Sequence, residues 1–356
     1  MLCPIQFTHA QAGITSIINQ LLLDDCPIQT EPPLAVCTPP VLETQADIDA
    51  FQSVEVVKGH LQIEAETDLD FSPFANLREI QGILYIQNGA LSSINGFNNL
   101  ESVGTRAASF GFGRAVQIEN NPNLVSISGF QNLRKSTHPE GWSPYINILF
   151  NPSLTQINGF NQLDQAAGVS IRYNTNLTTV TGFGSLHTID TGIGLVITNS
   201  AALSTLPSFA NLTTSSGGIE LYNLPSITSM PWFQNMTSTS WVRVHNLGIS
   251  DLRSFNNSGF LTVRRLSITN NPNLTLISGF QNLRSIEGVA GDLYISDNAL
   301  LNNVTGFNSL ITNDPTDYIS ISDNPNLNCP VELFMLQDIA YSSGNLVNCA
   351  TTPYDF

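Results

Sequence analysis

NNPNLVSISGFQNLR at residues 120–134 returns as NNPNLTLISGFQNLR at residues 270–284, and weaker copies fill the chain between and around them. The most regular feature of the copies is a phenylalanine, usually after glycine, at spacings from 22 residues (Phe233 to Phe255) to 33 residues (Phe97 to Phe130). Such self-similarity is typical of solenoids, propellers and arrays. The ten phenylalanines of this column are Phe74, Phe97, Phe130, Phe160, Phe183, Phe209, Phe233, Phe255, Phe280 and Phe307.

Each unit opens with a short alternating stretch such as Leu84-Tyr85-Ile86, and period-2 alternation predicts a half-buried strand. A turn such as Asn271-Pro272 follows, then a second apolar pair and the Gly-Phe corner. A propeller blade needs four strands and about 40 residues, which these units do not have. We therefore predict an all-β, right-handed parallel β-solenoid of about eleven coils with a core of stacked Ile, Leu and Phe.

The stretch ADIDAFQSVEVVKGHLQI at residues 46–63, FANLREIQGILYIQN after it and the NNPNL..ISGF.NL cassettes resemble the receptor L-domain family. That family comprises the leucine-rich-repeat-like β-helices of insulin- and EGF-receptor ectodomains and related secreted or wall proteins. The resemblance covers roughly residues 44–329. It implies the fold and an extracellular or cell-surface location, but no single function. The family's opening coil often has a cysteine where this chain has Val54, which leaves Cys37 without its usual partner.

Three regions are expected: an N-terminal helix and Pro-rich extension (residues 1–43), the solenoid (residues 44–328) and a C-terminal cap (residues 329–356). Cysteines occur only in the first and last of these regions, which favours disulfide-stapled caps in an oxidising compartment over a reduced protein with scattered thiols. The favoured bridge joins the two C-terminal cysteines, so one N-terminal cysteine is left free or pairs between subunits. Their long spacing does not favour a metal site. The five candidates are Cys3, Cys26, Cys37, Cys329 and Cys349.

The N-terminal region contains an apolar stripe at helical spacing, which Asp24, Asp25 and a Pro-rich stretch bring to an end. This helix is too short to span a membrane and lacks the basic start of a signal peptide. Because an exposed apolar stripe is unfavourable in water, it should cover the open end of the solenoid or dock on a neighbouring subunit. Its residues are Ile14, Ile17, Ile18, Leu21 and Leu22.

The composition excludes a nucleic-acid partner. The formal net charge is -16, only 11% of the residues are charged, and Lys58 and Lys135 are the two lysines, so a polyanionic backbone would be repelled. No cofactor motif is found.

Solenoid enzymes that act on polysaccharides need clustered carboxylates on adjacent outward positions. Glu64 and Glu119 are two coils apart without a third acid between them. Asp292 lies closer to Asp297 and Asp323, but the last two precede Asn in turns and are expected to be turn residues. We therefore predict a protein that is not an enzyme, with a polysaccharide-active β-helix as the weakest alternative.

Six N-x-S/T triplets are candidate N-glycosylation sites in a eukaryotic source, although a chain this rich in Asn, Ser and Thr should contain about six by chance. Asn211 and Asn235 share one repeat column, so glycans could line a face. Alternatively, these asparagines are turn formers whose amides satisfy the backbone of the neighbouring coil. The candidates are Asn176, Asn211, Asn235, Asn256, Asn273 and Asn303.

Two non-catalytic functions remain. The chain is either an extracellular recognition or adhesion domain that uses an exposed face, or a structural subunit of a fibre, sheath or wall, since uncapped terminal coils are sheet edges. Assembly is slightly favoured, with a second copy, an extracellular protein or a glycan as partner. The loops at residues 105–114 and 135–144 suit either function. Trp142, Trp232 and Trp241 are expected to be contact aromatics or corner packing.

If the chain is a structural subunit that docks through its N-terminal helix, native material should form filaments in electron micrographs. Deletion of residues 1–36 should abolish these filaments, because it removes the apolar stripe. A monodisperse monomer with and without the segment would contradict the assembly hypothesis.

Overall fold

The structure is a computed structural model of the whole chain. It describes residues 35–36, 40–105, 114–136, 145–207, 209–257, 259–260, 262–286, 292–311, 318–328, 339–341 and 343–345. The five cysteines, the apolar stripe of residues 14–22 and Trp142 lie outside these ranges. The disulfides and the N-terminal helix therefore stay predictions.

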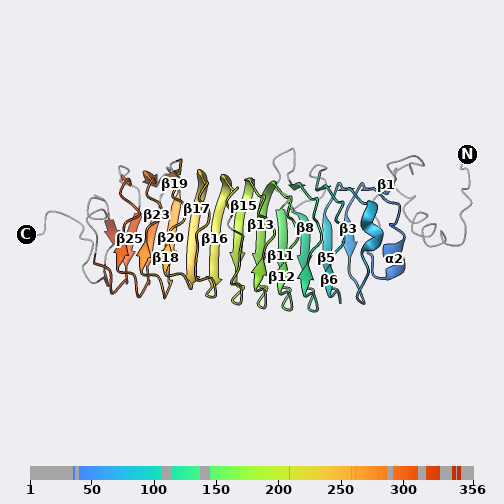
Figure 1. Cartoon of the computed structure of the whole chain (residues 1–356), viewed down its shortest axis with the longest axis horizontal. Coiled ribbons are helices and arrows are strands. Elements are labelled where there is room, and N and C mark those ends of the chain that lie inside the picture. The colour runs from blue at the N-terminus through green and yellow to red at the C-terminus, as the bar shows by residue number, and fades with distance from the viewer. Residues whose placement is uncertain are drawn as a thin grey trace, which may run out of the picture.

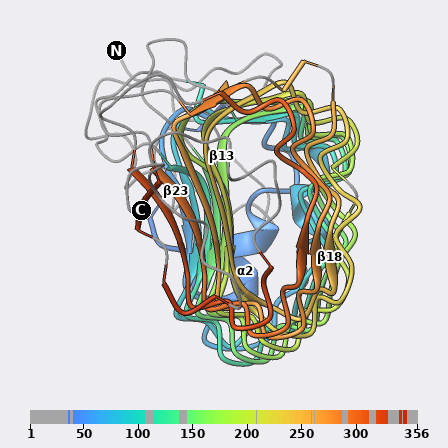
Figure 2. The ribbon, with the colours of Figure 1, turned by 90° about the vertical axis from the view of Figure 1, so that its left-hand side faces the viewer.

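The described strands form a parallel β-solenoid of about ten turns, close to the eleven coils expected from the repeats. Every strand pairing among the described residues is parallel and joins equivalent positions of neighbouring coils. Figure 1 shows the coils stacked along one axis, from α2 at one end to β25 near the other. Seen along that axis, β13 and β23 lie in one wall and β18 in the opposite wall (Figure 2). The predicted all-β parallel solenoid is thus confirmed.

The wall with the longest strands is called the broad sheet. Its strands are β3 (Leu61–Ile63), β5 (Leu84–Gln87), β8 (Arg114–Glu119), β11 (Tyr145–Leu149), β13 (Gln165–Arg172), β15 (Thr188–Thr198), β16 (Thr214–Leu224), β17 (Ser238–Leu247), β20 (Arg265–Thr269), β23 (Asp292–Ser296), β25 (Tyr318–Ser322) and β26 (Ile339–Tyr341). A short strand precedes it in the early coils, and single strands cover both positions from β13 to β17. These short strands are β1 (Ala35–Val36), β2 (Val56–Val57), β4 (Glu79–Ile80), β7 (Ser102–Val103) and β10 (Lys135–Ser136).

The remaining strands have two residues each and complete the coils. They are β6 (Ser93–Ile94), β9 (Ser126–Ile127), β12 (Gln156–Ile157), β14 (Thr179–Val180), β18 (Asp251–Leu252), β19 (Thr262–Val263), β21 (Leu276–Ile277), β22 (Ser285–Ile286) and β24 (Asn303–Val304). Each early coil therefore has three short straight pieces, as the repeat predicted.

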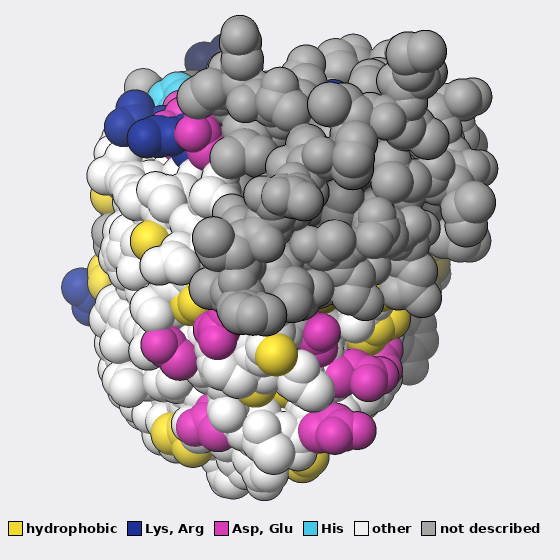
Figure 3. All heavy atoms as spheres, turned by 90° about the vertical axis from the view of Figure 1, so that its right-hand side faces the viewer, with side chains coloured by type: hydrophobic (Ala, Val, Ile, Leu, Met, Phe, Trp, Pro, Cys, Tyr) yellow, Lys and Arg dark blue, Asp and Glu magenta, His cyan; other side chains and the backbone are white. Residues whose placement is uncertain are grey.

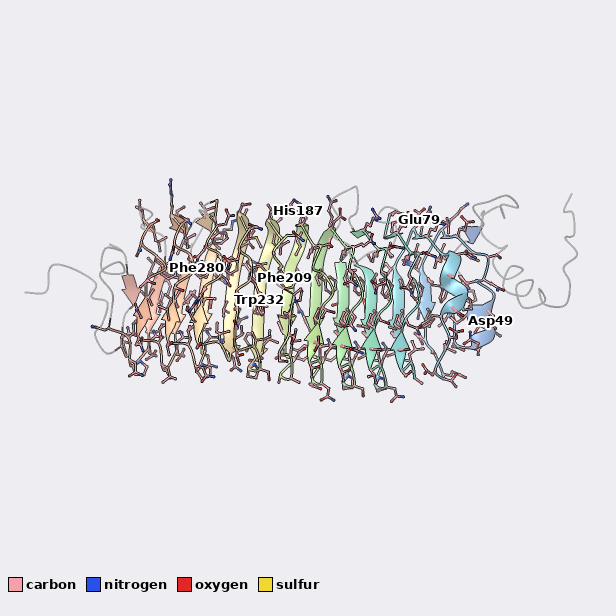
Figure 4. All side chains as sticks on the ribbon, viewed as in Figure 1. Asp49, Glu79, His187, Phe209, Trp232 and Phe280 are labelled. Carbon is pink, nitrogen blue, oxygen red and sulfur yellow. The ribbon has the colours of Figure 1, made fainter. Side chains whose placement is uncertain are left out.

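The phenylalanine column forms a stack through the core. All ten rings are buried, and Phe160 stacks between Phe130 and Phe183 with ring centroids 4.8 and 4.9 Å apart. Figure 4 labels Phe209 and Phe280 of this column at two places along the rod. Stacked pairs contribute about 0.5 to 1.5 kcal/mol each beyond their burial.

The glycine before the phenylalanine is required by the close approach of successive coils. A Cβ on Gly159 would overlap the carbonyl oxygen of Gly129 in the coil before it. Phe160 itself has φ 62, in the left-handed region that costs roughly 1 kcal/mol or more for a side chain of this kind. Stacking against both neighbouring rings offsets that cost, so the Gly-Phe corner is a consequence of coil spacing.

Buried asparagines form a ladder at the turn after the broad sheet. Asn151 donates from Nδ2 to the carbonyls of Ile118 (3.1 Å) and Leu149 (3.0 Å) and to Asn174 Oδ1 (3.2 Å). Its Oδ1 accepts from the backbone N–H of Asn121 (3.1 Å). The same role is filled by Asn121, Asn151, Asn174, Asn271, Asn298 and Asn324, all fully buried.

At the N-terminal end, α2 (Gln45–Asp49) and the 3-10 helix η2 (Ser72–Asn76) fold over the first coils. Thr44 and Asp47 form a capping box, and Ile48 and Phe51 are buried, with the Phe51 ring 5.3 Å from Phe74. Part of the capping expected from the N-terminal extension is thus carried by α2.

The described part of the end face beside α2 carries several acidic side chains, with Lys, Arg and His side chains at one edge (Figure 3). Figure 3 shows acidic side chains over the part of this face that the described residues form. Glu43, Asp49 and Glu66 are exposed there in the first coils.

Asn151→Ala should lower the free energy of unfolding by about 2 to 4 kcal/mol, because it leaves two buried carbonyls and an N–H, in two successive coils, without partners. Urea unfolding measures this loss. Asn302→Ala is the matched control: Asn302 is exposed, and its replacement should change stability by less than about 0.5 kcal/mol. Equal effects of the two substitutions would contradict a structural role for the ladder.

Candidate functional site: a groove on the broad sheet

A groove of about 750 Å³ lies on the outer surface of the broad sheet, over β16, β17, β20 and β23. We call it the Trp241 groove. Its size is within the usual range for small-ligand sites, about 300 to 1,000 Å³. Its side chains come from four coils and are Glu220, Trp241, Arg243, Arg264, Arg265, Ser267 and Tyr294.

Strand alternation places these residues outside. In β17, Val242 and Val244 are buried in the core, so Trp241 and Arg243 face outward. Parallel register then aligns the neighbours into two rows along the rod. One row runs from Trp241 through Arg265 to Asp292, and the other from Glu220 through Arg243 and Ser267 to Tyr294.

Trp241 is half-buried and lies flat over the preceding strand. A Cβ on Gly218, its register partner in β16, would overlap the indole ring. In β15 the same position is Gly194, with φ 85, where a Cβ would overlap the carbonyl oxygen of Gly218. Two successive glycines therefore make the flat seat on which the indole rests.

Two of the three groove arginines are matched by carboxylates. Arg243 donates to Glu220 Oε1 at 3.0 Å, and its guanidinium carbon lies 4.5 Å from the centre of the Tyr222 ring. Arg265 donates from Nε to Asp292 Oδ2 at 2.8 Å, and Asp292 is buried. The Arg243 and Arg265 side chains are 43% and 61% exposed, so solvent screens both pairs and their main effect here is to orient the side chains.

Arg264 differs from its two neighbours. Its side chain is exposed, and no residue of the described ranges forms an ion pair or side-chain hydrogen bond with it. The groove therefore presents one guanidinium whose charge the described side chains do not neutralise.

His245 continues the aromatic surface beside the groove. Its ring stacks on Tyr222 with centroids 4.4 Å apart, and Nδ1 lies 2.8 Å from Thr269 Oγ1. Burial and then the positive charge of Arg243 lower the pKa of His245 below 6.5, against the opposing effect of Asp297. The imidazole is therefore neutral at pH 7.

Tyr294 lies at the other end of the groove. Burial, followed by the charge of Asp292, raises the pKa of the Tyr294 hydroxyl above 10. The hydroxyl therefore stays protonated at neutral pH and is able to donate a hydrogen bond.

The carboxylates considered for catalysis do not form a cluster. Gln87 separates Glu64 from Glu119 in the register and donates to Glu64 Oε1 at 2.9 Å. Asp297 and Asp323 have φ 57 and 54, as expected of turn residues. Among the described residues, no group of three His, Cys, Asp or Glu side chains could hold a metal ion.

The candidate glycosylation sites differ in exposure. Asn256 is half-buried, and the other five are exposed. Asn211 Nδ2 donates to the Gly184 carbonyl (2.9 Å) and Asn235 Nδ2 to the Ala210 carbonyl (2.7 Å), each in the coil before. The expectation that such amides satisfy neighbouring backbone is confirmed for these two residues. Use of any of the six sites stays a prediction.

Sequence reasoning missed the groove as a unit. Trp241 was considered as a contact residue on equal terms with Trp232, yet Trp232 is buried and stands edge-on to Phe233. The outward column that contains Glu119 continues through the register to Tyr222 and His245, whereas Trp241 and Arg265 occupy another column of the same sheet. The signal available was the pair Gly194 and Gly218 before Trp241 at one repeat position.

The comparison with protein families agrees with the fold. The model of the receptor L domain family matches residues 54–141, which confirms the resemblance to that family over the first coils. No curated protein sequence matches the chain. The crystal structure of the LRIM1/APL1C complex is similar at 13% identity and a TM-score of 0.25, over 79% of this chain. The match covers 55% of the other chain, so this chain spans little more than half of its length.

The described part of the chain contains no helix with the length and apolar character that a membrane span needs.

Arg243→Gln should raise the pKa of His245 toward 6.5, because it removes a positive charge that disfavours the imidazolium. In the native chain, the unfolded state binds more protons in the window just below pH 6.5, so stability should fall as pH is lowered through that window. NMR titration of the His245 ring in both proteins measures the shift. A pKa that stays the same or falls in the variant would contradict this account.

Proposed function

We propose that this chain is a non-catalytic recognition protein that works outside the cell and binds its ligand in the Trp241 groove. The observation that carries the proposal is the indole seated on Gly218 beside the exposed guanidinium of Arg264. Tryptophan and arginine dominate the binding energy of many interfaces. The stacking of the coils does not require an outward-facing tryptophan or arginine at these positions.

The match to the receptor L domain family supports the extracellular location, since the resemblance is to the ectodomains of cell-surface receptors. The fold supports recognition in general, because stacked coils present a long surface whose outward residues vary without disturbing the core. Fold alone does not define a ligand, so the proposal depends on the groove.

The groove's acidic side chains support a non-catalytic role. Glu220 and Asp292 are each bound by an arginine, Arg243 and Arg265 respectively. Catalysis by a carboxylate pair needs two carboxyl groups that act on the same bond, whereas each of these two carboxylates is paired with its own arginine.

The structural-subunit hypothesis stays a prediction. Its apolar stripe and its odd cysteine lie outside the described residues. Neither self-association nor ligand binding is tested by the described residues, and the proposal of ligand binding rests on the groove.

The proposal predicts that binding depends on Trp241. The purified chain should bind at least one member of an array of extracellular proteins and glycans. Trp241→Ala should weaken that binding by about 30-fold or more, as expected for a buried aromatic anchor worth about 2 kcal/mol.

Tyr173→Ala is the matched control. Tyr173 is 45% exposed and stacks on Phe150, outside the groove. Its replacement should leave binding within about twofold, a difference of less than 0.5 kcal/mol. Thermal unfolding of both variants shows that they remain folded. Ligands that bind wild type and Trp241→Ala equally well would contradict the proposed function.

A further inference from the structure

The groove concentrates positive charge in an acidic protein. The chain has 12 Lys and Arg against 28 Asp and Glu, yet three arginines line this one site. Glu220 and Asp292 match two of them. Arg264 is exposed beside them, and the described side chains provide no counter-charge for it. A ligand with an anionic group would supply that charge, and guanidinium groups bind carboxylate and sulfate-like oxyanions through paired hydrogen bonds.

The groove also presents flat and hydroxyl-binding surfaces. The indole of Trp241 rests with one face on Gly218, which leaves the ring parallel to the sheet surface. Ser267 lies between Arg243 and Tyr294, so a small side chain forms the floor between two large ones. Trp241 and Tyr294 stand two strands apart, about 10 Å along the rod. This span fits a short chain of rings better than one compact ion.

Other classes of ligand fit less well. A folded protein partner usually buries about 800 Å² on each side, far more than this groove offers by itself. A purely anionic ligand, such as an acidic peptide, would meet the carboxylate of Glu220 inside the same site. An apolar ligand would leave Arg264 and Ser267 without partners. A ligand with many hydroxyls donates to Glu220 while its one acidic group reaches Arg264.

We infer that the Trp241 groove binds an acidic oligosaccharide, with a sugar ring on Trp241 and a carboxylate or sulfate on Arg264. This inference rests on the proposed function, because it names the ligand class of the same site. Glu220 accepts hydrogen bonds from the sugar hydroxyls, and the Tyr294 hydroxyl donates one to the next ring. The positions of Arg243 and Arg265 are fixed by their carboxylates, so Arg264 is the residue that selects for acid.

The test is isothermal titration calorimetry of the full chain with four probes. These are a hexagalacturonate for carboxylate, a heparin-derived hexasaccharide for sulfate, cellohexaose as the neutral sugar and hexaglutamate as the acidic peptide. We expect one of the two acidic sugars to bind at least tenfold more tightly than cellohexaose or hexaglutamate. Arg264→Gln should reduce that affinity by about 10- to 100-fold, as for other charge-assisted contacts.

Arg134→Gln is the matched control, because Arg134 is exposed, lies outside the groove and loses the same charge. It should leave the affinity within about twofold. Equal losses in the two variants, preferred binding of cellohexaose or hexaglutamate, or no binding of either acidic sugar would overturn the inference. If a neutral ligand or a protein from the array binds through Trp241, the proposed function stands and the inference falls. If no ligand depends on Trp241, the proposed function fails as well.

Discussion

The constraint on which this structure depends is the fixed spacing of successive coils. Backbone pairing sets neighbouring strands about 4.8 Å apart, and every buried group must then find its partner in the coil above or below. In six coils an asparagine of the ladder meets that requirement. Asn151, for example, bonds the carbonyls of Ile118 and Leu149 and the N–H of Asn121. The phenylalanine stack meets it for the core, with rings 4.8 to 4.9 Å apart around Phe160.

The same spacing explains where the chain departs from its repeat. The ladder position is leucine at Leu224 and Leu247, in the two coils whose strands β16 and β17 support the groove. Gly194 and Gly218 precede Trp241 in the strand register, and neither has a side chain that would displace the indole. The core needs neither glycine for its own packing, since Val242 and Val244 face inward on the next strand. The groove is therefore built on the regular stack through local changes in the outward residues.

Sequence reasoning was effective where one residue type repeats in one column. The phenylalanine column, the alternating strand and the Gly-Phe corner predicted the parallel solenoid, its core and its three-sided early coils. The groove was not predicted, because it depends on register between strands that are 24 to 27 residues apart, such as Trp241 with Arg265 and Arg265 with Asp292. The sequence also does not show which arginines are paired. In the structure Arg243 and Arg265 have carboxylate partners, while Arg264 has none among the described residues. The caps depend on cysteines outside those residues, so their pairing stays a prediction.

The central claim is that ligand recognition occurs on β16, β17, β20 and β23 and not at the ends of the rod. Hydrogen–deuterium exchange of the full chain, with and without saturating hexagalacturonate or the heparin-derived hexasaccharide, tests it most directly. The account predicts added protection in peptides that cover residues 214–224, 238–247 and 264–269, with little change in the first coils. Protection confined to residues 40–105, or to the chain ends, would contradict it.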